Sequence, residues 1–333
     1  MLLDFSVSCN PFGPPRTILQ GLSDVPIHLY PDSQSTEVTS LLSHKLKILP
    51  NNIIIGNGST ELLRLAVLAY LSSKDKVIIP QPTYGDYEQA CGIVNAKIIP
   101  YHLDENSQFH MDVDNFINWS LQYKPKAIFL CNPNNPTGQY LKRGDVKKII
   151  AAFQDSLIVL DEAYVAFTQE RWDSLSLLEL PNLLILRSMT KDYALAGLRL
   201  GYGIASQQII GSLKKVKPPW NVNSLAVHAG AIALSCDDFL SESLPRISEA
   251  KQFLINQITV MGFSVLPSQC HYFLLKAGDA RKFRESLLTR GVVVRDCTSF
   301  GLPAYVRIAP RRMEDCHKLI QAMEEMIGKN RKG

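Results

Sequence analysis

Short apolar runs rich in β-branched residues alternate with helix-length segments between residues 50 and 205, and this alternation constrains the fold most strongly. Several runs, such as residues 157–160 and 183–186, are continuously apolar, as expected of strands covered by helices on both faces. The predicted strands are residues 52–55, 76–79, 96–100, 127–130, 157–160, 183–186 and 201–205. The predicted helices between them are residues 59–71, 84–92, 113–122 and 143–153. The pattern predicts an α/β fold with an open, mostly parallel sheet.

The pattern changes after Pro218-Pro219. A long helix is predicted over residues 224–260, a shorter one over 280–290 and a last one over 313–327. Short strands are predicted at residues 263–265, 272–275, 292–294 and 306–309. The sequence therefore predicts an N-terminal arm (1–30) packed on the small domain, a large domain (31–235) and a small α+β C-terminal domain (236–333).

Composition argues against several classes of function. No apolar run approaches the roughly 20 residues of a membrane span, and the N-terminus lacks the basic-then-apolar pattern of a signal peptide. The 35 basic residues barely exceed the 31 acidic ones and form no long block, which argues against nucleic acid as a partner. The seven cysteines form no CxxC pair and the seven histidines no HxH or HxxxH pair. We therefore expect a cytoplasmic protein with neither a disulfide framework nor a metal site.

Residues suited to ligand binding follow successive predicted strands, at the edge where open α/β sheets bind ligands. The turn GNGSTE (56–61) either offers backbone N–H groups to an anion or is a capping box at Ser59 or Thr60. Tyr84 follows the next strand and could stack on a planar ligand. Asn135 lies in a loop of turn-forming residues, which is either only a turn or presents an amide to a ligand.

A carboxylate and a lysine follow the next two strands. Asp161 is either a helix N-cap or, if buried, needs a cationic partner such as a protonated pyridine nitrogen. Lys191 follows the hydroxyl residues Ser188 and Thr190 and precedes Arg199 by eight residues. A lysine that forms a Schiff base needs surroundings that lower its pKa, and hydroxyls with a guanidinium suit a phosphate. The alternative is a Ser/Thr loop that ends in a structural arginine.

Three motifs carry a specific resemblance: NNPTG (134–138), DEAY (161–164) and TKDYALAGLRLGY (190–202). With NPFGPP (10–15), they make nearly the whole chain resemble the fold-type-I pyridoxal-phosphate enzymes of the class I/II aminotransferase superfamily. Within it, the chain resembles the branch that contains histidinol-phosphate aminotransferase and threonine-phosphate decarboxylase. This resemblance implies a large domain with a mostly parallel open sheet, a smaller α+β domain, and pyridoxal 5′-phosphate as cofactor.

The resemblance also implies roles for residues around the cofactor. Lys191 would form the Schiff base and later carry the proton at the substrate Cα, and Asp161 would keep the pyridine nitrogen protonated. Asn135 and Tyr164 would hydrogen-bond the phenolic oxygen of the ring, and Tyr84 would stack on its face. The predicted phosphate ligands are Gly58, Ser59, Ser188, Thr190 and Arg199. Tyr30 resembles the tyrosine that reaches the phosphate from the neighbouring subunit, which implies a homodimer.

Three further residues are implied at the substrate site. Arg307 matches the arginine that grips the α-carboxylate, and Asn10 is expected at the substrate mouth. Arg295 resembles the position that binds the substrate phosphate, with a surface salt bridge as the alternative. These roles imply a small phosphorylated amino substrate.

The reaction is less constrained than the cofactor, because decarboxylases and aminotransferases share these residues. The segments 4–6, 218–223 (which contains Trp220) and 295–303 resemble threonine-phosphate decarboxylase, an enzyme of cobalamin side-chain synthesis, and favour that reaction. Histidinol-phosphate aminotransferase, an enzyme of histidine biosynthesis, or another class I/II aminotransferase is the alternative. A structural relative of the same fold that has lost the cofactor is disfavoured because Lys191 and Asp161 are both present.

Overall fold

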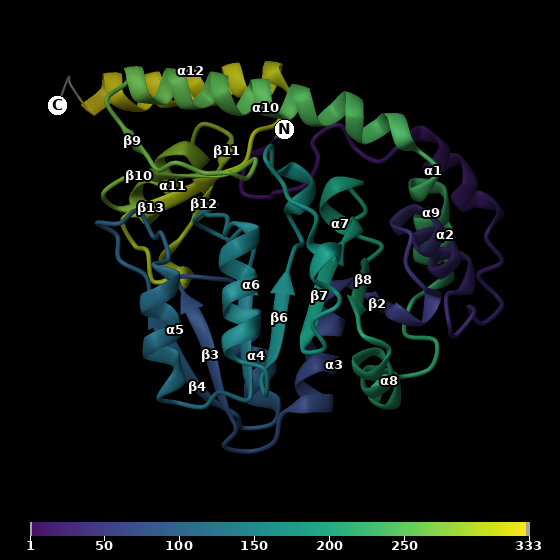
Figure 1. Ribbon diagram of the computed structural model, residues 1–333. Helices are drawn as coiled ribbons and strands as arrows, with labels where there is room; N and C mark the ends of the chain where they lie inside the picture. Colours follow the sequence, from purple (N-terminus) through teal and green to yellow (C-terminus); the bar gives the residue numbers. More distant parts are fainter. Residues whose placement is uncertain (1, 331–333) are drawn as a thin grey trace.

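The computed structural model describes residues 2–330 of the 333 and contains a seven-stranded sheet in the order β2-β8-β7-β6-β5-β3-β4 (Figure 1). β8 is antiparallel to both of its neighbours, and the other adjacent pairs are parallel. The strands are β2 (Ile53–Asn57), β3 (Lys76–Gln81), β4 (Lys97–His102), β5 (Ala127–Cys131), β6 (Leu157–Asp161), β7 (Leu183–Ser188) and β8 (Leu200–Ala205). The predicted α/β fold with a mostly parallel open sheet is confirmed.

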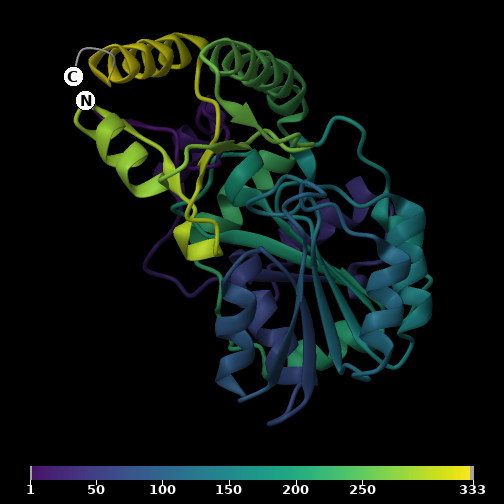
Figure 2. The same cartoon turned by 90° about the vertical axis from the view of Figure 1, so that its left-hand side faces the viewer.

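Helices cover both faces of this sheet (Figure 2). On one face pack α3 (Gly58–Tyr70), α4 (Asp86–Ile93) and α8 (Gln207–Val216), and on the other α5 (Val113–Leu121) and α6 (Arg143–Ala152). Val77 and Ile79 of β3 face the first layer, whereas Ile78 between them faces the second. Because successive side chains of a strand point to opposite faces, burial on both faces accounts for the continuously apolar runs.

A second, four-stranded antiparallel sheet lies in the C-terminal part of the chain, in the order β12-β13-β10-β9. Its strands are β9 (Ser264–Val265), β10 (Phe273–Lys276), β12 (Arg295–Asp296) and β13 (Tyr305–Ile308). The helices around it are α10 (Asp237–Val260), α11 (Ala280–Leu288) and α12 (Met313–Asn330), and α10 and α12 lie side by side at the top of Figure 1. Their apolar side chains share one core with β10, β13 and the short strand β11 (Val292–Val293).

The N-terminal segment contacts both parts of the molecule. Its first strand, β1 (Leu3–Asp4), pairs in parallel with β11 (Val292–Val293) beside the small sheet. Its helix α1 (Arg16–Gly21) packs instead on α9 (Ser224–Leu234), where Ile18 joins the core around Ala226 and Ala229. The division of the chain at residues 30 and 235 stays a prediction.

Two features of the sequence-based assignment need correction. The single helix predicted over 224–260 is broken into α9 and α10, because the backbone leaves the helical region at Cys236 (φ −94°, ψ 68°). Only two residues separate the helices, a break too short for the apolar pattern to reveal. The helices α2 (Thr36–Leu46) and α8 were not predicted, although Ser206 caps α8 by accepting a hydrogen bond from the Ile209 N–H. No helix within residues 2–330 is both long and apolar enough to cross a membrane.

Candidate active site

The carboxyl ends of β2, β3, β5, β6 and β7 meet at one edge of the large sheet and enclose a cavity. Most of the predicted cofactor residues line it, namely Ser59, Tyr84, Asn135, Asp161, Tyr164, Ser188, Thr190, Lys191 and Arg199. Thr60, Cys131 and Ala163 complete the lining. Cys131 and Ala163 were missed, although each lies just after a predicted strand, in the same position as the residues that were singled out.

One end of the cavity is built to receive an anion. Gly58 has a φ of +74°, and a Cβ there would lie 3.0 Å from the Arg199 Nη2 atom. Glycine avoids the strain of that conformation and lets the guanidinium approach the backbone. Ser59 follows in the first turn of α3, and the free N–H groups of a helix N-terminus are suited to bind an anion. The N-cap is Asn57, whose side chain makes no capping bond, so the capping-box alternative at Ser59 or Thr60 is wrong.

The hydroxyls of Ser188 and Thr190 lie at the same cavity, 2.6 Å from each other. They come from the end of β7 and from α7 (Met189–Asp192), the single helical turn that follows it. With the Arg199 guanidinium and the α3 N-terminus, they form a donor set suited to a phosphate.

The Asp161 carboxylate lies in the floor of the cavity and is buried. Tyr87 donates its hydroxyl to Oδ2 (2.8 Å) and the Ala163 N–H donates to Oδ1 (3.0 Å). Burial raises the pKa of Asp161, although these two hydrogen bonds oppose the shift. Among residues 2–330 no cation forms an ion pair with it. A protonated pyridine nitrogen fits this site, because a buried carboxylate is stable only beside a cation or strong donor.

Lys191 projects into the same cavity from α7, with its Nζ 5.9 Å from the centre of the Tyr164 ring. Burial lowers the pKa of Lys191, and the nearby cations Arg307 and Arg199 lower it further. A lowered pKa increases the share of neutral amine, which is the form that attacks a carbonyl carbon. Burial also raises the pKa of Tyr84 to about 12 and holds that of Tyr164 well above its usual value, so both phenols stay protonated at neutral pH.

Arg307 reaches this edge from the small sheet. Its guanidinium is buried, donates to the Asn135 side-chain oxygen and, over 2.9 Å, to the Ser6 carbonyl, and lies 5.1 Å from the Tyr272 ring centre. Its Nε has no hydrogen-bond partner among the described residues. Arg307, which is predicted to bind the substrate carboxylate, thus contacts Asn135, a residue of the predicted cofactor site.

Arg295 lies directly opposite Arg307 in the antiparallel pair of β12 and β13, so both side chains leave the same face of the small sheet. Arg295 is exposed, donates to the Ser299 hydroxyl (2.8 Å) and lies 5.4 Å from the Phe300 ring centre. Within the described chain it forms no ion pair, so the salt-bridge alternative is wrong.

Asn10 and Tyr30 are among the predicted residues that do not line the cavity. Asn10 is buried, and its amide donates to the Asp192 carbonyl (3.0 Å) and the Ser243 hydroxyl (2.8 Å), while its N–H donates to the Lys191 carbonyl (2.8 Å). Asn10 therefore holds the backbone of α7, the turn that carries Lys191 (the lysine turn), through these hydrogen bonds. Its expected place at the substrate mouth needs correction. Tyr30 is 80% exposed, away from the cavity of its own chain, and stacks on Trp220 with ring centres 4.6 Å apart.

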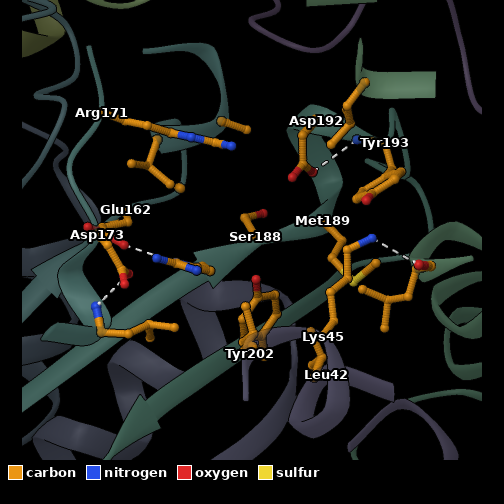
Figure 3. A pocket seen from close by; sticks show the side chains of 18 of the residues that line it. Leu42, Lys45, Glu162, Arg171, Asp173, Ser188, Met189, Asp192, Tyr193 and Tyr202 are labelled. Atoms are coloured by element: carbon orange, nitrogen blue, oxygen red, sulfur yellow. Dashed lines mark hydrogen bonds and ion pairs between the residues drawn. The ribbon is translucent and has the colours of Figure 1, made fainter. Parts of the chain in front are cut away.

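A second cavity shares Ala163 and Ser188 with the first. Figure 3 shows Met189 and Asp192 of α7 among the side chains that line it. In it Arg187 and the buried Glu162 form an ion pair of 2.9 Å, and Ser174 donates to Glu162 (2.8 Å) while accepting from Arg187 (3.0 Å). Sequence reasoning missed this pair. The available signal was strand alternation, because successive side chains point to opposite faces of a sheet. Glu162 follows Asp161 and Arg187 precedes Ser188, so both are expected on the face opposite to these two predicted cofactor residues.

Comparisons with known proteins agree with this geometry. The family profile described as "Aminotransferase class I and II" matches residues 2–323. The chain is 35% identical to the histidinol-phosphate aminotransferase of Thermoanaerobacter sp. (strain X514) over 325 residues, 96% of this chain and 91% of that protein.

Solved structures of two differently named enzymes are similar to this one. Histidinol-phosphate aminotransferase from Clostridium acetobutylicum superposes with a TM-score of 0.89 at 26% identity, covering 98% of this chain and all of that chain. L-threonine-O-3-phosphate decarboxylase from Porphyromonas gingivalis gives a TM-score of 0.86, with the same identity and coverage. The chain therefore belongs to the class I and II aminotransferase family, whose enzymes depend on pyridoxal 5′-phosphate.

Proposed function

We propose that this enzyme is a histidinol-phosphate aminotransferase, which exchanges an amino group between histidinol phosphate and a keto acid. The observation that carries the proposal is the similarity to curated relatives of that name, at 35% identity over 96% of the chain. These relatives favour the aminotransferase alternative over the decarboxylase that the peripheral sequence segments suggested.

The two arginines on one face of the small sheet support this substrate class. Arg307 would take the carboxylate of the amino-acid partner, and Arg295 the phosphate of histidinol phosphate. Guanidinium groups suit both tasks, because their donor pairs match the oxygens of carboxylates and phosphates.

The residues of the cavity divide the remaining work. The cofactor, when bound, accepts the electron pair that is left on the substrate Cα when one of its bonds breaks. Of the residues that line the cavity, Asp161 would hold a proton on the pyridine nitrogen, Lys191 Nζ would attach the cofactor and move the proton at Cα, and Tyr84 would cover the ring. The cofactor phosphate would be held by Gly58, Ser59, Ser188, Thr190 and Arg199, and the phenolic oxygen by Asn135 and Tyr164.

Two assays separate the candidate reactions. The aminotransferase is expected to consume histidinol phosphate only when 2-oxoglutarate is present and to release glutamate, which a coupled glutamate assay measures. Threonine-phosphate decarboxylase is the second candidate, supported by the solved structure at 26% identity. Release of CO₂ from phosphothreonine without any keto acid would decide for it.

Replacing Arg307 by alanine is expected to impair use of the keto acid much more than retention of the cofactor. Losing charged hydrogen bonds to a carboxylate costs about 1.5–3 kcal/mol, which lowers kcat/KM for 2-oxoglutarate by about 10- to 150-fold. Steady-state kinetics measure this loss, and the absorbance of the dialysed protein measures the cofactor. Arg281→Ala, an exposed arginine on α11, is the matched control. Equal losses of kcat/KM and cofactor would contradict the assigned role.

We also propose a homodimer in which Tyr30 completes the phosphate site of the neighbouring subunit. Large apolar side chains are exposed around Tyr30, including Ile27 (76%), Leu29 (58%) and Trp220 (50%). Such a group of side chains is typical of a surface that is covered in the assembly. Sedimentation velocity is expected to show a dimer, and Tyr30→Ala should weaken cofactor binding. A monomer with full activity would refute this proposal.

A further inference from the structure

A continuous set of hydrogen bonds joins the segment that carries Tyr30 to the turn that opens α3. Lys217, just after α8, donates its Nζ to the Ser33 carbonyl (3.0 Å) and to the Asn221 side-chain oxygen (2.7 Å). The Asn221 amide donates to Glu61 Oε2 (2.6 Å). The same Glu61 oxygen accepts the backbone N–H of Asn57 (2.6 Å). Three segments that are far apart in the sequence are thereby held together.

At the α3 end, this set of bonds acts on the predicted phosphate turn. Glu61 lies in the first turn of the helix, and Asn57 immediately precedes Gly58. The Asn57 N-cap has no side-chain bond of its own, so the Glu61 carboxylate orders the entry to the helix in its place. The position of this carboxylate therefore influences where the N–H groups of Gly58 and Ser59 point.

At the other end, Lys217 is held against a well-ordered loop. The Asp32 carboxylate accepts the N–H groups of Gln34 (2.9 Å) and Thr36 (2.7 Å), which fixes the backbone around Ser33. Trp220, between Lys217 and Asn221 in the sequence, stacks on Tyr30. Lys217 itself is partly buried, whereas Lys214 and Lys215 on the last turn of α8 are exposed.

We propose that Lys217 and Asn221 are positioning residues for the cofactor phosphate, acting through Glu61 on the turn at Gly58 and Ser59. Neither residue lines the cofactor cavity, and within their own chain the printed hydrogen bonds connect them to the phosphate turn through Glu61. The inference rests on the proposed assignment of this turn to the phosphate. It adds that the turn is braced from the segment that carries Tyr30.

The test compares Lys217→Met and Asn221→Ala with Lys215→Met, a control at an exposed lysine on the last turn of α8. The dissociation constants of pyridoxal phosphate and of pyridoxal, which lacks the phosphate, are measured by absorbance titration of the protein freed of cofactor. Both test variants are expected to weaken pyridoxal phosphate binding about 10-fold, with pyridoxal binding unchanged and the control like the wild type. The double variant is expected to lose no more than either single variant, because both act through one set of bonds.

Each result has one meaning. Equal weakening of pyridoxal and pyridoxal phosphate would overturn the inference, because it would reveal a general structural effect. Test variants that bind pyridoxal phosphate like Lys215→Met would overturn it too. If the wild type bound pyridoxal and pyridoxal phosphate with the same affinity, the assignment of the phosphate turn itself would fail. Thermal unfolding of each variant identifies any that does not fold, and the other test variant then decides.

Discussion

Replacing Lys191 by alanine is expected to remove the visible absorption of the protein with its cofactor and to lower turnover by about 10⁴-fold. The Lys191 amine lies in the cavity among the predicted cofactor residues, and its pKa is lowered mainly by burial. Its loss removes both the covalent attachment and the group that moves a proton at the substrate Cα, and general acid–base catalysis alone contributes up to about 10⁴-fold. Absorption spectra and steady-state kinetics measure the two effects.

The matched control is Lys251→Met. Burial lowers the pKa of Lys251 as it does that of Lys191, but Lys251 lies on α10, away from the cofactor cavity, and donates to the Ser268 carbonyl (2.6 Å). This variant should keep the visible absorption. A Lys191→Ala protein that still absorbs in the visible and turns over substrate would contradict the assignment of Lys191.

Replacing Arg187 by methionine is expected to lower the free energy of unfolding by about 3–5 kcal/mol, because it leaves Glu162 buried without its cation. The Glu162 side chain is fully buried, and burial already raises its pKa although Arg187 opposes the shift. Urea unfolding monitored by circular dichroism measures the loss. As a control, Lys148→Met breaks an exposed pair with Asp114 and should cost less than about 1 kcal/mol.

The loss in Arg187→Met should depend on pH in a defined direction. Without the arginine, the pKa of Glu162 in the folded protein lies still further above its value of 4.5 in the unfolded chain. The destabilisation is then fully developed above the folded pKa and declines as the pH falls towards 4.5, where the unfolded carboxyl also takes up a proton. Adding Glu162→Leu to Arg187→Met should recover much of the stability. A loss that is the same at pH 5 and pH 8 would exclude an unpaired carboxylate as its cause.

The sequence was most informative about strands and the residues that end them. The predicted strands 127–130 and 157–160 match β5 and β6, each of which is one residue longer in the structure. They were predictable because strands buried on both faces are continuously apolar. Residues that follow such strands can be predicted to lie close together without further information, since parallel strands end at one edge of the sheet. The neighbourhood of Tyr84, Asn135, Asp161 and Lys191 was predictable for that reason.

Residues contributed by other parts of the chain were less predictable. Asn10 was assigned to the substrate mouth, but its amide instead bonds Asp192 and Ser243, and nothing near residue 10 in the sequence indicates these partners. The pairing of Arg187 with Glu162 depends on the register of β6 and β7, which local patterns do not contain.

The sequence by itself determined the α/β class, the family and the set of residues around Lys191, because strand burial and short motifs are local properties. Only the tertiary structure decided which long-range partners those residues have. It placed Arg295 opposite Arg307, turned Asn10 towards the lysine turn and linked Lys217 through Asn221 to Glu61. Such contacts depend on strand register and on the packing of distant segments, such as those of Asn10 and Asp192, which lie 182 residues apart. A side chain's identity alone does not specify its distant partner.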